Sequence, residues 1–304
     1  MLSSILKAAL SKVTKFLIWT ERTASFTGGL RDVVWGSGGF VAVGENVDVI
    51  TSSDGITWTT RTVSGGSSLK IKVKWSNNRY VITYGSGIEI STDNISWTSI
   101  SAYVGPTTTP FYRSTIYTGS IYVSACSNPG AQDGAIYTSS TGAAGTWTAR
   151  YTQVNYLEDV AWSPTTLVAV GWGGTIISSS DGGINWTART SGTAVNLNGV
   201  AWTGTQFIAG GNSGTILTSP DGINWTARTS GIFTALEGIV QADDTIVVTG
   251  ASGRVICSED GGATWRSRSP RTGSVYISGV AWSGSTVVVV ADNGLDQPVI
   301  STSQ

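Results

Sequence analysis

The residues of this chain that could do chemistry are its carboxylates and its arginines, because it contains no His and only 2 Cys. Without His, histidine-based catalytic triads and histidine-ligated metal sites are excluded. Two carboxylates that flank a glycosidic bond are enough to hydrolyse it, and Glu45 with Asp292 is one candidate pair. No other feature of the sequence favours this reaction. We therefore predict no catalytic residues, no metal ligands and no cofactor.

These residues are carried by a repeat that runs from residue 17 to the end of the chain. A Ser-x-Asp-Gly turn followed by Trp is clearest as SSDGITW, which ends at Trp58. Further copies end at Trp97, Trp186, Trp225 and Trp265, and a degenerate copy ends at Trp147. Successive Trp spacings are 39, 50, 39, 39 and 40 residues, and Trp19 lies 39 residues before Trp58. A fixed period of this size predicts a repeat architecture.

Each repeat predicts four short strands separated by Gly or Asp-Gly turns. In residues 157–190 the strands are LEDVAW, LVAVGW, TIISS and INWTART, and residues 197–229 copy them closely. Four such strands form the β-meander of a propeller blade. First strands begin near Leu30, Leu69, Phe111, Leu157, Leu197, Leu236 and Tyr276. The sequence therefore predicts an all-β fold over residues 17–304, a seven-bladed β-propeller of four-stranded antiparallel blades.

The two ends of the chain predict how the ring closes. The seventh repeat stops at VISTSQ and lacks its fourth strand, with Gln304 in the position of Asp54. Residues 17–23, LIWTERT, match the fourth strand of other repeats. Joining both termini in one blade removes the free edges of an open sheet. We therefore predict that the N-terminal segment forms the outer strand of the last blade.

The carboxylates of the repeated turns have a structural explanation. An Asp in such a turn can accept backbone N–H bonds, and the Gly after it can adopt positive φ without steric cost. Asn94 can replace that Gly, since Asn tolerates the left-handed region. The residues concerned are Asp54, Asp181, Asp221 and Asp260, with Asp93 before Asn94. We expect them to shape turns rather than to react.

The face opposite these turns is the expected binding surface. It collects the turns between second and third strands and the connections between blades, and exposed aromatics among carboxylates suit a protein or glycan partner. Trp172 stands out because its position is small in neighbouring repeats. The expected residues are Glu45, Asp48, Tyr103, Asp133, Tyr156, Trp172, Phe233, Arg254, Asp292 and Asp296. In addition, Lys70, Lys72 and Lys74 alternate along one strand, which predicts a solvated or interface patch.

Residues 1–16 form a separate predicted unit, an amphipathic helix. Its apolar arc consists of Leu2, Ile5, Leu6, Leu10, Val13 and Phe16, together with Ala9. Lys7, Lys12 and Lys15 lie outside that arc. Such a helix can lie on its own domain, dock on a partner or sister chain, or lie on a membrane surface. We predict an anchoring or docking helix.

Composition limits the partners and the compartment. The net charge of −1 gives no global attraction to nucleic acid. No uninterrupted apolar run approaches the ~18 residues of a transmembrane helix, and the N-terminal lysines interrupt a signal-peptide core. Cys126 and Cys257 fall in the third and sixth repeats, too far apart in a ring to bridge, so both are expected as buried thiols. We expect synthesis in a cytoplasm.

The repeated turn resembles the Asp-box, or BNR, repeat over nearly the whole chain after residue 16. Carriers of this repeat include sialidases, sortilin-like receptors, photosystem II assembly factors and virion proteins of phages. The form at residues 173–186, with Gly-Gly before and within the motif, is most similar to the assembly factors. Sialidase chemistry, as the resemblance implies it, needs three arginines on one carboxylate. Six arginines here instead occupy one periodic position around the rim, namely Arg22, Arg61, Arg150, Arg189, Arg228 and Arg268.

The sequence thus predicts a non-enzymatic structural or binding propeller. The favoured setting is a phage virion, as a tail, neck or capsid-associated component docked through residues 2–16, made in the host cytoplasm and contacting host surface or glycan. The alternatives are an assembly-factor-like, protein-binding propeller and a glycan-binding lectin or glycosidase, and the alternative localisation is cytoplasmic. The expected partners are proteins of a larger assembly and a glycan.

Overall fold

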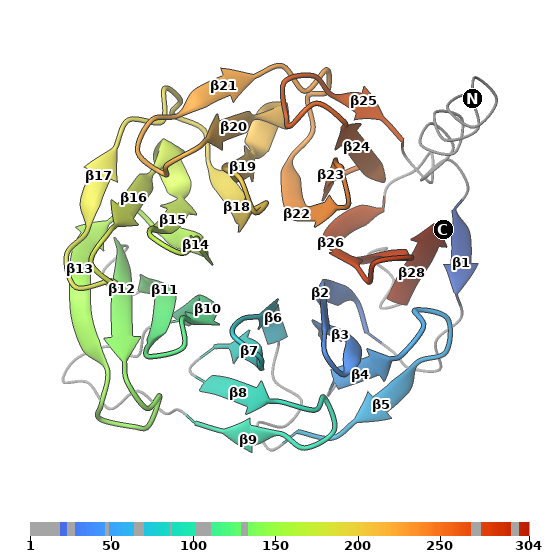
Figure 1. The fold of residues 1–304 in the computed structure, drawn as a ribbon, viewed down its shortest axis with the longest axis horizontal. Helices are drawn as coiled ribbons and strands as arrows, with labels where there is room; N and C mark the ends of the chain where they lie inside the picture. The colour runs from blue at the N-terminus through green and yellow to red at the C-terminus, as the bar shows by residue number, and fades with distance from the viewer. Residues whose placement is uncertain are drawn as a thin grey trace, which may run out of the picture.

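The computed structural model describes residues 19–22, 28–45, 49–63, 70–85, 87–100, 111–128, 133–268, 275–292 and 298–303. These residues form seven four-stranded antiparallel sheets arranged as the blades of a ring (Figure 1). The predicted fold class, an all-β seven-bladed propeller, is confirmed. The predicted helix at 2–16 lies outside the described residues, and the division into two units at residue 17 stays a prediction.

Each blade is a meander whose first strand is innermost and whose fourth strand is at the rim. Blades one to three contain β2 Leu30–Gly36, β3 Gly39–Gly44, β4 Val49–Ser52, β5 Thr59–Arg61; β6 Lys70–Trp75, β7 Tyr80–Tyr84, β8 Gly87–Ser91, β9 Thr98–Ser99; β10 Phe111–Tyr117, β11 Tyr122–Asn128, β12 Asp133–Ser139 and β13 Thr148–Val154. Blades four to six contain β14 Leu157–Trp162, β15 Leu167–Gly171, β16 Ile176–Ser179, β17 Thr187–Arg189; β18 Leu197–Trp202, β19 Phe207–Gly211, β20 Ile216–Ser219, β21 Thr226–Arg228; β22 Leu236–Ala242, β23 Thr245–Gly250, β24 Arg254–Ser258 and β25 Arg266–Ser267.

The seventh blade joins both ends of the chain. It contains β26 Tyr276–Trp282, β27 Val287–Asp292 and β28 Pro298–Ser303, and β1 Thr20–Arg22 pairs antiparallel with β28. Thr20 lies opposite Thr302, and Arg22 lies opposite Ile300. The indole N–H of Trp19 donates to the backbone oxygen of Arg268 in the sixth blade at 3.1 Å. The predicted closure by an N-terminal outer strand is therefore confirmed.

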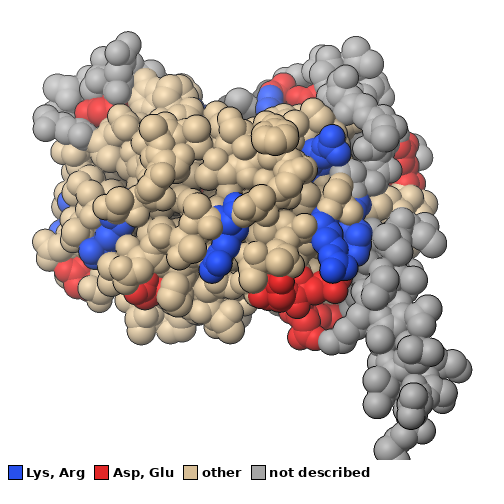
Figure 2. All heavy atoms as spheres, turned by 90° about the horizontal axis from the view of Figure 1, so that it is seen from above, with Lys and Arg blue, Asp and Glu red and all other residues tan. Residues whose placement is uncertain are grey.

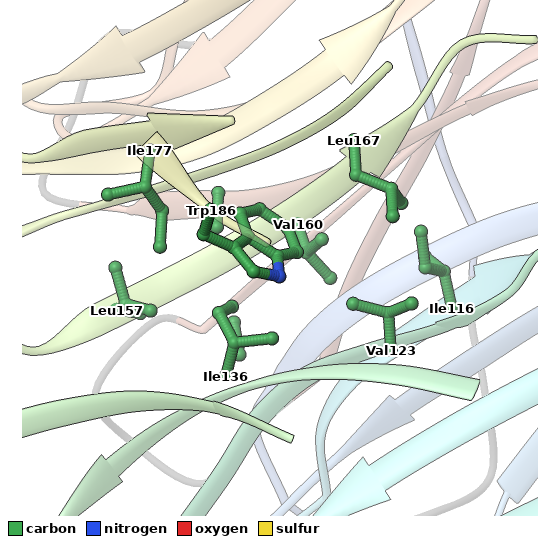
Figure 3. Close-up of a cluster of buried hydrophobic side chains, with 10 residues drawn as sticks. Ile116, Val123, Ile136, Leu157, Val160, Leu167, Ile177 and Trp186 are labelled. Atoms are coloured by element: carbon green, nitrogen blue, oxygen red, sulfur yellow. The ribbon is translucent and has the colours of Figure 1, made fainter. Parts of the chain in front are cut away.

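The hydrophobic core is divided among the seven interfaces between neighbouring blades. One buried cluster lies in each interface. Figure 3 shows the cluster between blades three and four, where Ile116, Val123 and Ile136 meet the facing side of the next sheet. That side contributes Leu157, Val160, Leu167, Ile177 and Trp186. Alternate residues of each strand face one neighbour or the other, so both faces of every blade are apolar.

A stack of aromatic rings runs across single blades and reaches the repeated turns. In blade one the ring centroids of Trp35 and Phe40 lie 4.6 Å apart, and those of Phe40 and Trp58 lie 6.2 Å apart. Blade two repeats this stack with Trp75, Tyr80 and Trp97, blade three with Tyr117, Tyr122 and Trp147, and blade five with Trp202, Phe207 and Trp225. The repeat Trp is therefore the outer end of a ring stack that begins at the channel.

The turns that carry the repeated Asp have the predicted geometry. Asp54 Oδ1 accepts hydrogen bonds from the backbone N–H groups of Ile56 and Thr57 at 2.8 and 2.9 Å. Gly55 has φ of 78°, and Asn94 takes the same region with φ of 58°. These backbone hydrogen bonds lower the pKa of Asp54, and equivalent bonds lower the pKa of Asp93 to about 2. The oxygens of these carboxylates are engaged by their own turns.

The rim carries few charges. Figure 2 views the ring edge-on, and most of the surface on that side is uncharged. Five of the six periodic arginines donate through Nε to a hydroxyl on the neighbouring strand of the same blade, as Arg189 does to Ser178 Oγ at 2.8 Å. Their separation around the rim agrees with the prediction that they do not converge. No helix among the described residues is long and apolar enough to cross a membrane.

We predict that removing β1 opens the ring. A chain that begins at Thr23 loses the pairing with β28 and the packing of Trp19, and loss of a large aromatic costs about 3–5 kcal/mol. Its melting temperature is expected to fall by about 10 °C, measured by circular dichroism. The matched control begins at Leu17 and keeps the strand. Equal melting temperatures for the two chains would contradict closure through this strand.

Candidate functional site

The innermost strands of the seven blades surround the centre of the ring (Figure 1). Their side chains line three cavities along a central channel. Residues at the start of these strands line a cavity of about 350 Å³, here called the mouth. Residues in the middle line one of about 160 Å³, the waist. Residues at the end of the strands line one of about 580 Å³, the funnel. The channel therefore has two openings on opposite faces, with different residues at each.

The mouth opens on the face that carries two kinds of loop: the turns between second and third strands and the connections between blades. The backbone N–H of Glu45, after β3, donates to the oxygen of Gly29, before β2, at 2.9 Å. Trp172, after β15, makes the same bond to Tyr156, before β14, at 2.9 Å. The turns between second and third strands thus contact the connections between blades, as predicted. This surface is called the loop face below.

Trp172 and three neighbouring side chains form a cluster at the edge of the mouth. The indole N–H of Trp172 donates to Glu158 Oε1 at 2.7 Å, and its ring lies edge-on to Tyr156 with centroids 4.7 Å apart. Arg113 Nε lies 3.7 Å from Glu158 Oε2. Trp172 is still 43% exposed. The structure therefore brings together two predicted residues, Tyr156 and Trp172, and adds Glu158 and Arg113, which the sequence did not single out.

A second cluster joins Glu45 and Asp292, the pair considered for glycoside hydrolysis. Arg31 bonds to Glu45, and its Nη2 lies 3.7 Å from Asp292 Oδ2. The two carboxylates come from blades one and seven, so closure of the ring brings them together. Both face one guanidinium, and neither lines the mouth cavity. This geometry is that of an ion-pair cluster.

The remaining predicted residues of the loop face are spread around the ring. Phe233, in the connection between blades five and six, is 91% exposed. Arg254 begins β24 and is exposed, and Asp133 begins β12. Asp48, Tyr103 and Asp296 lie outside the described residues. The predicted set is therefore one face rather than one compact site.

The waist contains buried charges that the sequence analysis missed. Lys72 Nζ lies 3.4 Å from Glu237 Oε1 in blade six, and Lys74 Nζ lies 2.8 Å from Asp159 Oδ1 in blade four. Ser114 Oγ also donates to Asp159 Oδ1 at 2.6 Å. The two ion pairs connect blades that are not neighbours, blade two with blade six and blade two with blade four. They lie between the mouth and the funnel.

The predicted solvated patch of lysines is therefore wrong for Lys72 and Lys74. Lys72 is 6% exposed, because β6 is an innermost strand whose alternate side chains face the channel. The side chain of Lys70 lies outside the described residues. The sequence did contain an indication of these buried charges. Asp32 and Asp159 occupy a strand position that is Gly in blades five to seven. A Cβ at Gly199 would lie 2.1 Å from a backbone oxygen, so glycine is needed there.

The charges of the waist set one another's protonation. Burial alone would lower the pKa of Lys72, but the carboxylates of Glu237, Asp159 and Asp32 outweigh it and raise that pKa. Burial alone would raise the pKa of Asp159, but Lys74 and Lys72 outweigh it and lower that pKa. For Asp32 burial prevails over the two lysines and raises the pKa to about 6. Lys72 and Asp159 are therefore charged at neutral pH, and Asp32 titrates just below it.

Asp32 and Asp159 also connect neighbouring blades. Asp32 Oδ1 accepts from the backbone N–H of Val33 at 2.9 Å, and its Oδ2 accepts from Val73 in the next blade at 3.1 Å. Asp159 makes the same two bonds, to Val160 and to Val200 of the next blade. Each carboxylate thus serves a structural role as well as an electrostatic one.

The two cysteines lie away from the channel charges described above. Cys126 and Cys257 are buried and free, as predicted. Burial raises the pKa of each thiol to about 12, which disfavours the reactive thiolate. Among the described ranges, no group of three or more His, Cys, Asp or Glu side chains is arranged to hold a metal ion.

The chain matches no protein-family model and no curated protein sequence, but solved structures share its fold. A structure of YCF48 bound to D1 peptide is 19% identical with a TM-score of 0.71, covering 94% of each chain. Virginiamycin B lyase from Staphylococcus aureus is 10% identical with a TM-score of 0.76, covering 94% of this chain and 98% of that one. The WD40 propeller domain of Doa1 is 13% identical with a TM-score of 0.68, covering 94% and 96%. At these identities the comparisons show the propeller fold alone.

The Asp32 carboxyl gives the waist a testable pH dependence. Because its folded pKa of about 6 lies above the ordinary 3.8, its stabilising contribution is complete below pH 3.8 and is lost as pH rises through 6. Other groups aside, the free energy of unfolding should fall by about 1.4 kcal/mol between pH 5 and pH 8, because about one unit of the pKa shift lies in that window. Urea unfolding at both values measures it.

Asp32→Asn is the matched variant, because it cannot titrate. The pH difference in unfolding free energy is expected to shrink by most of that amount. Asp54→Asn, on an exposed turn, is the control and should leave the difference between pH 5 and pH 8 unchanged. A pH dependence that persists in Asp32→Asn would refute the assignment.

Proposed function

We propose that this protein is a non-enzymatic, protein-binding propeller that recognises a segment of its partner on the loop face. The observation that carries the proposal is the pair of exposed aromatics, Trp172 and Phe233, beside a mouth lined by charges of both signs. Exposed aromatic side chains next to a polar cavity are typical anchors of protein interfaces. The virginiamycin B lyase likeness concerns the fold, and this chain has no His for acid–base chemistry.

The two aromatics belong to one continuous surface. Gly173, next to Trp172, donates its N–H to Asn196 Oδ1 at 3.0 Å, and Asn196 accepts from the N–H of Asn212 at 2.9 Å. The turn after Asn212 continues to Gly214, which donates to the backbone oxygen of Thr234 beside Phe233 at 2.8 Å. A row of hydrogen-bonded loops thus links blades four, five and six.

Neighbouring side chains fix the orientation of the Trp172 ring before any partner binds. Its indole N–H is fixed by Glu158, and its ring is supported by Tyr156, so little side-chain entropy is lost when a partner covers it. Phe233 has no comparable support and is 91% exposed. A phenyl ring so exposed contributes almost nothing to folding, since its apolar area stays in water. Contact with a partner would account for it.

The mouth suits a polar segment beside these anchors. Its lining includes Arg31, Arg113, Glu158 and Glu237. Side chains of both signs can bond to the carbonyl and N–H groups of an extended peptide as well as to its charged side chains. The fold likeness to YCF48, which was solved with a D1 peptide, supports this class of ligand by analogy.

The virion setting, a host-surface or glycan ligand, the Asp-box family assignment and the cytoplasmic origin stay predictions. No comparison supports the virion setting. Peptide recognition is compatible with a role in assembly, which is the alternative that the propeller neighbours favour.

Selection of displayed random peptides on the immobilised full chain tests the proposal. Peptides enriched on the native protein are expected to lose affinity about tenfold or more on Trp172→Ala or Phe233→Ser, because each variant removes an anchor. Ile184→Ser is the control, since Ile184 is 55% exposed on a repeated turn of the opposite face. No enrichment, or equal binding to all variants, would exclude the loop face.

The predicted docking helix is tested by mass in solution. Light scattering should give a higher mass for the full chain than for a chain that begins at Leu17, because only the full chain carries the apolar arc that includes Leu6 and Leu10. Both chains retain β1, so both should melt at similar temperatures. Identical monomeric masses would assign residues 2–16 to their own propeller instead.

A further inference from the structure

The funnel, on the face opposite the mouth, has walls of a different chemistry. In five blades the innermost strand ends or nearly ends in Trp, at Trp35, Trp75, Trp162, Trp202 and Trp282. Three of these indoles line the funnel together with aliphatic side chains from blades one, three and six, among them Val34, Ile116 and Val240. Its volume of about 580 Å³ falls within the range of small-molecule sites. These side chains make much of the wall apolar and aromatic, and the polar side chains of Ser76, Asn77, Thr203 and Gln241 complete it.

The indole rings use only part of their surface for folding. Trp75 stacks outward on Tyr80 with centroids 4.5 Å apart, and Trp202 stacks on Phe207 at 4.8 Å. Trp75, Trp162 and Trp202 nevertheless remain partly exposed. Their inner edges therefore present apolar surface to the funnel, while the outward faces fix the rings in place.

The floor of the funnel carries a single cation, Lys74, among the residues that line it. The equivalent strand position is Val34, Ala161, Ala201, Val240 or Ala281 in other blades. Lys74 Nζ contacts both oxygens of Asp159, at 2.8 and 3.0 Å, and its side chain is 23% exposed. An ammonium group has three N–H donors. One carboxylate leaves it with capacity for a further acceptor on the funnel side.

Lys74 neutralises Asp159, but blade packing alone does not call for a cation at this position. A buried ion pair contributes little net stability, and apolar residues of similar volume often replace one without loss. Six blades place an apolar residue at the position of Lys74, including Ile116 in blade three. A lysine at the floor of an aromatic cavity is instead the arrangement that recognises an apolar molecule with an anionic end.

We propose that the funnel binds an amphipathic anion, with its apolar body against the indole rings and its carboxylate accepting a hydrogen bond from Lys74. Neither the loop face nor the mouth takes part. The carboxylate can belong to a free aromatic or aliphatic acid or to the C-terminal residue of a polypeptide, since both present the same chemistry.

Binding of such an anion is linked to the waist. Asp32 faces Lys72 and Lys74 from β6 and Asp159 from β14, and Glu237 lines the same cavity from β22. A carboxylate arriving at Lys74 adds negative charge near Asp32 and favours its protonated form. The affinity for the anion therefore increases as pH falls from 7.5 to 5.5. Asp32→Asn removes this dependence.

Calorimetry with 1-naphthaleneacetate and its neutral amide, 1-naphthaleneacetamide, tests the proposal on the full chain. The acid should bind about tenfold more tightly than the amide, and Lys74→Gln should remove that difference. Ala201→Phe fills the funnel and should abolish binding of both. Trp172→Ala is the control, and it should change neither affinity, which separates this site from the loop face.

Three results would overturn the proposal: no heat of binding with either probe, equal affinities for acid and amide, or an unchanged preference in Lys74→Gln. If Lys74→Gln unfolds because Asp159 loses its partner, Lys74→Gln with Asp159→Asn replaces it, checked by thermal melting. The peptide Gly-Gly-Phe with a free carboxylate, against its C-terminal amide, identifies the source. Binding of the free peptide points to a polypeptide C-terminus, and binding of naphthaleneacetate alone points to a small acid.

Discussion

The pairing of β1 with β28 is the constraint on which the rest of the structure depends. In a ring, every blade buries both faces against neighbours, and each of the seven apolar clusters needs two sheets. Without the closing strand, the seventh blade would present an open sheet edge. The same closure brings Asp292 of blade seven to Arg31 of blade one. β1 thus completes the seventh blade, which packs on blade one where Arg31 meets Asp292.

The fold could be predicted because the residues that fix each repeated turn lie close together in the sequence. Ser52, Asp54 and Gly55 fix a turn with bonds that span a few residues, and Trp58 returns over it to donate to the oxygen of Gly55. Short-range patterns of this kind can be recognised in a single sequence. The missing fourth strand of the last repeat then predicted that the N-terminal strand closes the ring. The order of strands in a blade also predicted which loops share a face, and Trp172, Tyr156 and Glu45 lie there. That this face binds a partner stays a prediction.

The channel could not be predicted in the same way. Lys74 and Asp159 lie 85 residues apart in the chain, and they meet only because the ring brings blade four opposite blade two. The alternation of lysines along β6 is the pattern of a strand with one wet face, and an innermost strand shares that pattern. Because β6 is an innermost strand, its lysines face carboxylates in the channel rather than solvent.

The buried charges of the waist lie between the two ends of the channel. Ion pairs from Lys72 and Lys74 cross it between the polar mouth and the aromatic funnel. In blades two and five the funnel indoles Trp75 and Trp202 stack on Tyr80 and Phe207, which supports the funnel wall from outside. A seven-fold scaffold thus carries two surfaces of unlike chemistry. Asp32 accepts hydrogen bonds from blades one and two and titrates near neutrality. It is therefore the group through which binding at one end of the channel can affect the other end.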